Sequence, residues 1–269
     1  MIKVYVFHTG SVRVDRSIPL HENNPLAVTG LFRGKNKQQI LPVSAYLIMH
    51  PEGNILIDTG WDTKYLTERP TEWLGLVDRI SRPILKENEG IDSKLAELGL
   101  QDTDIDAVYF SHLDFDHTSG IRLVKNANAF YAAKEEITDA KKNRIRYVDT
   151  WTGIADIGSF EYENTGIGPV GKSFDVFGDG TVILVNIPGH SHGLFAVKVT
   201  GSKNYMILAN DGAYLQDSFE KQIIPGFIVD KEMAIMSLKW LIDCKNDSRC
   251  TDVLANHDPT VKEHLVTIC

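Results

Sequence analysis

The sequence contains little cysteine, and the few residues it has form no recognisable framework. Cys244, Cys250 and Cys269 are its three cysteines among 269 residues, and all lie close to the end of the chain. An odd number in one short stretch suits neither the paired cysteines of small secreted domains nor a four-cysteine zinc site. We therefore expect reduced thiols and a cytoplasmic protein.

Long hydrophobic runs and an excess of positive charge are also missing. No apolar stretch approaches the roughly 18 residues of a membrane span, and Met1–Gly10 mixes polar with apolar residues, unlike the continuous apolar core of a signal peptide. The formal net charge of -8 disfavours binding to nucleic acid or to an anionic membrane. We expect a small-molecule partner, and the oligomeric state stays open.

The chain does have many short runs of β-branched and aromatic residues, which predict strands, and fewer segments with the apolar spacing of a helix. The predicted strands are Lys3–Phe7, Ser44–Met49, Asn54–Ile57, Ile105–Phe110, Ala129–Ala132, Thr181–Ile187, Phe195–Val199, Tyr205–Ala209 and Asp252–Ala255. The predicted helices are Thr71–Glu87, Ser93–Leu98, Lys134–Asn143 and Asp230–Cys244. Because the two kinds alternate without a repeat or a linker, we expect one α/β domain over residues 1–269.

Two stretches carry no regular pattern. His21–Gln39 is polar and contains glycine, and Tyr147–Gly180 is rich in glycine. Long irregular segments of a compact domain are often functional loops, so both are candidates for the walls of a substrate cleft. The alternative interpretation is that they are surface loops that cover the core.

Acidic and histidine side chains follow four of the predicted strands at the point where each strand ends. They are His112, Asp114, Asp116 and His117 after the first of these strands, then His190, Asp211 and His257 after the other three. In open α/β sheets, ligands gather at the carboxyl ends of the strands. Imidazole and carboxylate groups from four strand ends therefore predict a convergent metal site.

The spacing within residues 112–117 indicates how two ions would share these side chains. In an extended segment, side chains two residues apart face the same side, so His112 and Asp114 suit one ion. Asp116 and His117 are neighbours that point apart unless the chain turns, and we expect them to hold a second ion about 3.5–4 Å from the first. The competing interpretation is a solvated polar loop.

These residues resemble the metallo-β-lactamase superfamily and, within it, the N-acyl-homoserine lactonase-like branch. The likeness covers most of the chain. The matching positions are Asn54–Gly60 with Asp58, then His112, Asp116 and His117, then Pro188–His190, Asp211, Tyr214 and His257–Asp258. The resemblance implies an α/β fold of the αβ/βα sandwich type, in which two mixed sheets carry helices on their outer faces and the site lies at one edge.

The resemblance also implies a ligand set and a reaction for a dinuclear metal-dependent hydrolase. One divalent ion would be held by His112, Asp114 and His190, the other by Asp116, His117 and His257, with Asp211 bridging them. Hydroxide between the ions would attack the carbonyl of a lactone or related ester. Tyr214 would stabilise the oxyanion, and Asp116 would pass a proton to the leaving alkoxide. Simple packing beside the site is the alternative for Tyr214.

Two positions depart from the family pattern. Asp114 stands where the superfamily usually has a second histidine, and the added negative charge favours iron or manganese relative to zinc, which is otherwise the expected metal. Ser191-His192-Gly193 follows the proline-glycine-histidine segment. We expect His192 to support the site or to lie on the surface, with an additional ligand as the alternative.

Other functions use the same residues. A phosphodiester or thioester hydrolase is one alternative. Another is a non-catalytic metal-binding or sensor protein, in which Asp114 has cost the site its affinity for the first ion. The densest basic run, made of Lys141, Lys142, Arg144 and Arg146, would favour phosphate esters if it lined the cleft. We interpret this run as the solvated face of a helix and its exit.

Overall fold

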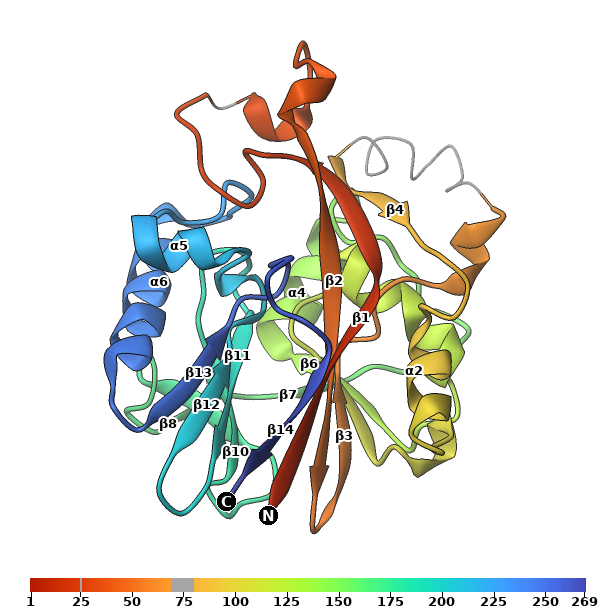
Figure 1. Cartoon of the computed structure of the whole chain (residues 1–269), viewed down its shortest axis with the longest axis vertical. Helices are drawn as coiled ribbons and strands as arrows, with labels where there is room; N and C mark the ends of the chain where they lie inside the picture. The colour runs from red at the N-terminus through yellow and green to blue at the C-terminus, as the bar shows by residue number, and fades with distance from the viewer. Residues whose placement is uncertain (25, 69–79) are drawn as a thin grey trace.

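A computed structural model describes residues 1–24, 26–68 and 80–269. Within these residues two β-sheets lie face to face at the centre of the molecule, and helices cover the outer side of each sheet (Figure 1). Both termini lie at the lower end of this view, where β1 and the last strand, β14, run side by side.

The first sheet has the strand order β14-β1-β2-β3-β5-β6-β7, with β4 paired to β1. Its strands are β14 (His264–Ile268), β1 (Ile2–Asp15), β2 (Gln38–His50), β3 (Gly53–Ile57), β5 (Ala107–Phe110), β6 (Phe130–Ala133), β7 (Gly158–Phe160) and β4 (Arg82–Ile84). The neighbours from β3 to β7 are parallel and the other pairs are antiparallel, so the sheet is mixed.

The second sheet has the order β13-β12-β11-β10-β9-β8. Its strands are β13 (Cys250–Leu254), β12 (Tyr205–Leu208), β11 (Phe195–Thr200), β10 (Val182–Asn186), β9 (Lys172–Asp175) and β8 (Glu163–Asn164). The pair β12–β13 is parallel and the others are antiparallel. This sheet is also mixed, as the family resemblance implied.

Alternating side chains divide the core into layers. Tyr46 and Ile48 of β2 pack between the two sheets, whereas Ala45 and Leu47 face the helices on the outer side. The strands β10 and β12 alternate in the same way between the central layer and the opposite outer layer. Because successive side chains of a strand point to opposite faces, both faces of each sheet become apolar.

Helices complete the outer layers. The described helices are α2 (Ile91–Glu97), α3 (Phe115–Thr118), α4 (Lys134–Lys142), α5 (Gln216–Lys221) and α6 (Lys231–Asn246). Short 3-10 turns are η1 (Ala27–Thr29), η2 (Lys35–Lys37), η3 (Thr63–Leu66), η5 (Asp102–Asp104), η6 (Ser119–Val124) and η7 (Asn210–Gly212). α6 buries Leu238 and Leu241 against the second sheet, and α2 buries Ile91 and Leu95 against the first.

Each of the nine strands predicted from the sequence overlaps a strand of the structure, whereas β4, β7, β8, β9 and β14 were not predicted. The predicted helix Thr71–Glu87 is not confirmed in its described part. Its residues up to 79 lie outside the described residues, and Arg82–Ile84 form β4 rather than a helix. Pro83 lacks a backbone N–H and cannot continue a helical turn, which explains the difference.

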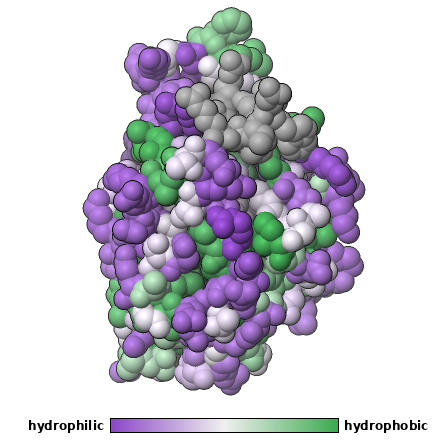
Figure 2. Space-filling model, turned by 90° about the vertical axis from the view of Figure 1, so that its right-hand side faces the viewer, coloured by the Kyte–Doolittle hydropathy of each residue, from purple (hydrophilic) through white to green (hydrophobic). Residues whose placement is uncertain are grey.

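The outer surface is mainly polar on the face turned toward the viewer in Figure 2, where hydrophobic residues lie in small groups among hydrophilic ones. Among the residues that the structure describes, no helix has the length and apolar character needed to cross a membrane.

Candidate metal centre

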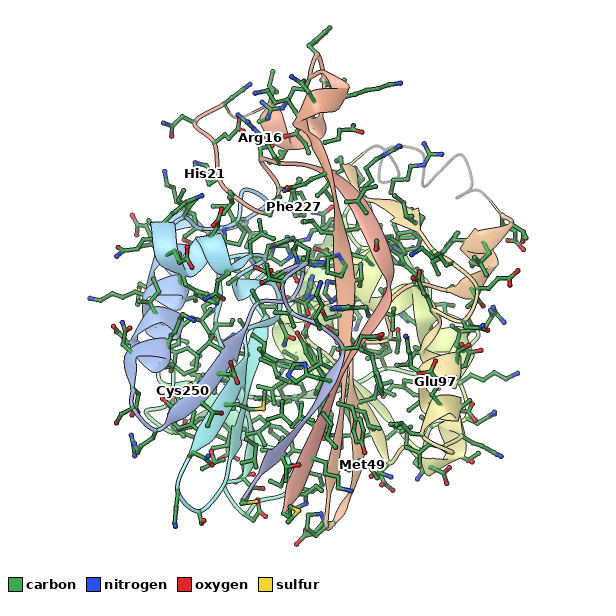
Figure 3. The ribbon with its side chains drawn as sticks, viewed as in Figure 1. Arg16, His21, Met49, Glu97, Phe227 and Cys250 are labelled. Atoms are coloured by element: carbon green, nitrogen blue, oxygen red, sulfur yellow. The ribbon has the colours of Figure 1, made fainter. Side chains whose placement is uncertain are left out.

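Seven acidic and histidine side chains converge where the strands of both sheets end. His112 and Asp114 lie in the loop after β5, Asp116 and His117 in α3, His190 after β10, Asp211 in η7 after β12, and His257 after β13. Phe227, whose backbone oxygen lies 2.7 Å from His190 Nδ1, marks this end in Figure 3, opposite to Met49. The sequence prediction that four strand ends would meet is thus realised in space.

The described side-chain atoms that could bind a metal ion form two groups. Within each group, these atoms lie within 4.8 Å of one another. One group contains His112, His190 and Asp211, and the other contains Asp116, His117 and His257. This arrangement separates His112 from His117, in the way that their spacing in the sequence suggested. Asp114 belongs to neither group, and the role of each side chain as a ligand stays a prediction.

Each of the four imidazole rings is held through its Nδ1 atom. The partners of Nδ1 are Ser111 Oγ for His112 at 3.0 Å, Asp58 Oδ2 for His117 at 2.8 Å, Phe227 O for His190 at 2.7 Å and Pro42 O for His257 at 2.8 Å. A carbonyl oxygen only accepts, so the rings of His190 and His257 carry the proton on Nδ1 when neutral. Their Nε2 lone pairs then face the cluster.

Unpaired nitrogen atoms show that the cluster suits a divalent cation. The Nε2 atoms of His112 and His117 are buried and have no hydrogen-bond partner. A buried polar atom without a partner is unfavourable, because it has lost its hydrogen bonds to water. A metal ion coordinated by Nε2 would satisfy both atoms, and imidazole together with carboxylate is a common ligand set for zinc, iron and manganese.

Asp211 is placed to join the two groups. Its Oδ1 lies 3.4 Å from His117 Nε2 and 3.1 Å from His257 Nε2. Its Oδ2 lies 3.8 Å from His112 Nε2 and 3.7 Å from His190 Nε2. One carboxylate oxygen therefore faces each group, which is the geometry that a bridging carboxylate needs.

Asp58 supports the cluster from the end of β3. Its carboxylate accepts hydrogen bonds from the backbone N–H of Ser111 at 2.7 Å, from Ser111 Oγ at 2.6 Å and from His117 Nδ1 at 2.8 Å. Asp58 adopts φ 60, a left-handed conformation that aspartate and asparagine tolerate better than most residues. With this turn, the carboxylate reaches both Ser111 in the loop after β5 and His117 in α3.

Asp114 is paired with Arg146, and its Oδ2 also lies 3.4 Å from His112 Nε2 and 3.0 Å from His190 Nε2. Arg146 Nε donates to Asp114 Oδ1 at 2.7 Å and Nη2 donates to Oδ2 at 2.8 Å. The Arg146 side chain is only 7% exposed, so the interpretation of the basic run as a solvated face is wrong for this residue. Lys141, Lys142 and Arg144 are exposed, as that interpretation expected.

The charges around the cluster differ from one ring to the next. Burial opposes a charged His117, yet the carboxylates of Asp211, Asp58 and Asp116 outweigh it and raise the pKa of this ring well above its usual value. The same competition between burial and Asp211 raises the pKa of His257. Burial, together with the charges of Arg146 and His112, instead lowers the pKa of His190 despite the Asp114 carboxylate 3.0 Å from its Nε2.

Both central carboxylates stay ionised. Burial opposes the charge of Asp211, but His257 and His117 hold its pKa well below the usual range. Burial likewise opposes the charge of Asp114, but the Arg146 charge, together with the nearby rings of His112 and His190, holds that pKa well below the usual range.

Tyr214 lies beside both histidine groups. Its ring stacks on His257 with centroids 4.7 Å apart and meets His190 edge-on at 5.9 Å. Burial, reinforced by Asp211 and Asp116, raises the pKa of Tyr214 well above its usual value, so the phenol keeps its proton. Tyr214 also lines a pocket next to the cluster.

This pocket is largely apolar. Its hydrophobic lining includes Val12, Val14, Ile18, Phe115 and Phe227, and Asp114, Asp116 and Arg146 also border it. Neither His21–Gln39 nor Tyr147–Gly180 contributes a described residue to this lining, but residues 147–152 and 154 line a second pocket, so their role as walls of a substrate cleft stays a prediction. In the lining of the apolar pocket, the long strand β1 and residues 143–146 take their place, because β1 continues to Asp15 where the sequence suggested an end at Phe7.

His192 lies on the surface. Its side chain is 56% exposed and its Nδ1 lies 2.5 Å from Asp139 Oδ2 of α4. It belongs to neither described ligand group, in line with the expectation of a surface or supporting role.

Two mixed sheets with outer helices, and a histidine and aspartate cluster where the strands end, define a metal-site protein of the αβ/βα sandwich class. Residues 39–205 match the family model described as the metallo-beta-lactamase superfamily. The chain therefore belongs to the metallo-beta-lactamase superfamily.

Curated relatives include lactonases and a hydrolase. The chain is 27% identical over 270 residues to the N-acyl homoserine lactonase AttM of Azorhizobium caulinodans, covering 96% of this chain and 94% of the relative. It is 31% identical over 183 residues to a probable metallo-hydrolase of Methanocaldococcus jannaschii, covering 67% of this chain and 71% of the relative.

Solved structures share the fold. An N-acyl homoserine lactone hydrolase with N-hexanoyl-L-homoserine bound at its catalytic metal center gives a TM-score of 0.73 at 24% identity, covering 96% of this chain and 94% of that chain. The dizinc quorum-quenching lactonase AidC gives a TM-score of 0.63 at 14% identity, covering 96% and 88%.

Proposed function

We propose that this protein is a metal-dependent hydrolase that opens a lactone or related ester at a site for two divalent ions. The observation that carries the proposal is the position of Asp211, whose two carboxylate oxygens face separate groups of histidine Nε2 atoms. Full-length likeness to N-acyl homoserine lactonases supports an acyl-homoserine lactone as the substrate class.

The donor set supports zinc as the metal, with iron or manganese as the alternatives that added carboxylates favour. Asp116, His117 and His257 would hold one ion, His112 and His190 the other, and Asp211 both. Two bound ions lower the pKa of a water from about 15.7 to roughly 7 and polarise a carbonyl oxygen.

The remaining steps belong to side chains of this chain. Tyr214 keeps its phenolic proton and lies beside His190 and His257, so it is placed to donate to a carbonyl oxygen that gains charge. Asp116 borders the pocket and is placed to take a proton from the attacking water and to pass it to the departing alkoxide. The apolar side chains of Val12, Val14 and Ile18 would hold the acyl chain of the substrate and exclude water.

The structure favours an ester over a phosphodiester. A free arginine or lysine at the pocket would favour a phosphate, but Arg146, which borders it, already makes two hydrogen bonds to Asp114. The exposed Lys141 and Arg144 do not line this pocket. We also propose that residues 1–269 act as one unit in the cytoplasm, since ligands come from both sheets and the three cysteines are free.

A substrate panel with metal analysis tests the proposal. Protein purified without added metal is analysed for zinc, iron and manganese, and is assayed with an acyl-homoserine lactone, a p-nitrophenyl phosphodiester and a glutathione thioester. We expect turnover of the lactone, its loss on chelation and its return with metal. Turnover of the phosphodiester alone would refute the lactone assignment. Metal without turnover of any substrate would favour the binding or sensor protein.

A further inference from the structure

Arg146 sits inside the cluster as a fixed cation. Besides its two hydrogen bonds to Asp114, its Nη1 donates to the backbone oxygen of His190 at 2.9 Å. Its guanidinium lies 4.7 Å from the ring centroid of Phe227 and 5.1 Å from that of Tyr147. Hydrogen bonds in the plane and aromatic rings beside it fix the position of the guanidinium.

We call the group of His112, His190 and Asp211 the first position and the group of Asp116, His117 and His257 the second position. The same guanidinium contacts a ring nitrogen of the first position. Arg146 Nη2 lies 3.1 Å from His190 Nε2. Because His190 Nδ1 donates to the carbonyl of Phe227, Nε2 of the neutral ring has a lone pair and accepts this hydrogen bond. An ion at His190 would have to displace the Arg146 donor.

The second group meets only an uncharged competitor among the described residues: Asn256 Nδ2 lies 3.4 Å from His257 Nε2 and donates to Asp211 Oδ1 at 3.1 Å. His117 Nε2 has no hydrogen-bond partner, and His257 Nε2 faces Asp211 Oδ1 at 3.1 Å. Asp116 Oδ2 lies 3.9 Å from His117 Nε2 and makes no ion pair with an arginine or lysine that the structure shows. The charged neighbours of this group are carboxylates, whereas at His190 the Asp114 carboxylate, 3.0 Å from Nε2, is already paired with the Arg146 cation.

We propose that Arg146 makes the two positions unequal, so that one ion binds tightly at Asp116, His117, His257 and Asp211 and a second ion binds only weakly at His112 and His190. The inference rests on the two-ion site of the proposed function. Arg146 acts here as a positioning residue: it holds Asp114 and His190 for its own hydrogen bonds and adds charge that repels a cation.

Metal titration of the chelated full-length protein tests the inference without any activity assay. Zinc is titrated calorimetrically, and bound metal is counted after dialysis against buffered free zinc. We expect one tight equivalent and a second that is at least about tenfold weaker, the range in which groups around metal ligands usually act. Two equivalents of equal affinity would overturn the inference. Absence of any bound metal would overturn the proposed function and this inference with it.

Variants assign the positions. Arg146→Gln should strengthen the second equivalent by about tenfold or more, while Arg146→Lys, which keeps the charge, should leave it weak. Arg144→Gln, an exposed neighbour, is the matched control and should titrate as the wild type. An unchanged second equivalent in a folded Arg146→Gln protein would refute the role of Arg146.

Two further variants keep the test valid if Arg146→Gln fails to fold. His190→Ala should retain the tight equivalent, and His257→Ala should lose it. The reverse pattern would show that the tight ion sits at the first position and would overturn the inference.

Discussion

The two candidate metal positions share Asp211, but the charged side chains around them differ. At the second position, His117 is backed by Asp58 at 2.8 Å and has Asp116 beside it, so carboxylates surround the ring. At the first position, His190 has Arg146 at 3.1 Å, and the extra carboxylate of Asp114 is paired with that arginine. Similar ligand atoms therefore meet different charges.

The difference arises from side chains outside the ligand groups. Asp58 directly follows β3 and Arg146 follows α4, and both lie far in the sequence from the rings that they contact. Each acts through hydrogen bonds that orient a ring or occupy its free nitrogen. A ligand motif alone thus defines where ions bind, while its neighbours decide how strongly each one binds.

The largest effect should follow from removing the carboxylate that the positions share. Asp211→Asn takes away the negative charge between four Nε2 atoms, so both positions lose a ligand. We expect lactone turnover, measured as kcat/KM, to fall by about 1,000-fold or more, since charge stabilisation at such sites is worth several kcal/mol. Bound metal should drop at the same time.

The matched control for this change is Asp217→Asn, which alters an exposed carboxylate that pairs with Lys221 in α5. It should leave turnover and metal content unaltered. Retention of both ions by a folded Asp211→Asn protein would mean that the two positions do not share a carboxylate.

Tyr214→Phe should have the next largest effect, because Tyr214 contacts a ring of each position. Loss of one donor to a developing oxyanion typically costs about 100-fold in kcat. We expect a decrease of this size in lactone turnover with unchanged KM and unchanged metal content. Tyr131→Phe, in β6, is the control. Normal kcat in Tyr214→Phe would leave this tyrosine with a packing role alone.

Asp58→Asn should weaken one position selectively. Asparagine keeps the left-handed backbone, but it has one acceptor oxygen instead of two and no negative charge, so the three hydrogen bonds to Ser111 and His117 cannot all form and the ring of His117 is held less firmly. We expect affinity for the tight ion to fall by about tenfold in zinc titrations. Asp106→Asn, an exposed carboxylate that accepts from Asn54 N–H, should have no effect on it. Equal weakening of both ions would contradict the distinction between the positions.

The sequence carried much of this picture in local form. Alternating apolar residues predicted the buried strands, and polar residues after them predicted that His112, His190, Asp211 and His257 would meet. The family match confirms the fold class that the resemblance implied. These features are readable because strand periodicity and strand ends are properties of neighbouring residues.

What the sequence did not reveal depends on contacts between distant segments. Arg146 was interpreted as part of a solvated run, because nothing local shows that its guanidinium reaches Asp114 and His190. The pairing of β1 with β14, in which Ile2 faces Ile268, joins the two ends of the chain and has no local signal either. Periodicity predicts which residues are buried, and it does not predict their partners.

The smallest effect is expected at His192, and it sharpens where the first position ends. His192 follows His190 by two residues, yet its ring is 56% exposed and pairs with Asp139 rather than with the cluster. His192→Ala should leave both metal affinities within about twofold, since outer partners of ligands, when they act, change affinity by 10–100-fold. The free energy of unfolding should change by no more than about 1 kcal/mol, as for other exposed ion pairs. Zinc titration and urea unfolding measure both. If the weakly bound ion at His112 and His190 bound more weakly still in this variant, His192 would be part of the first position, which would then reach the surface.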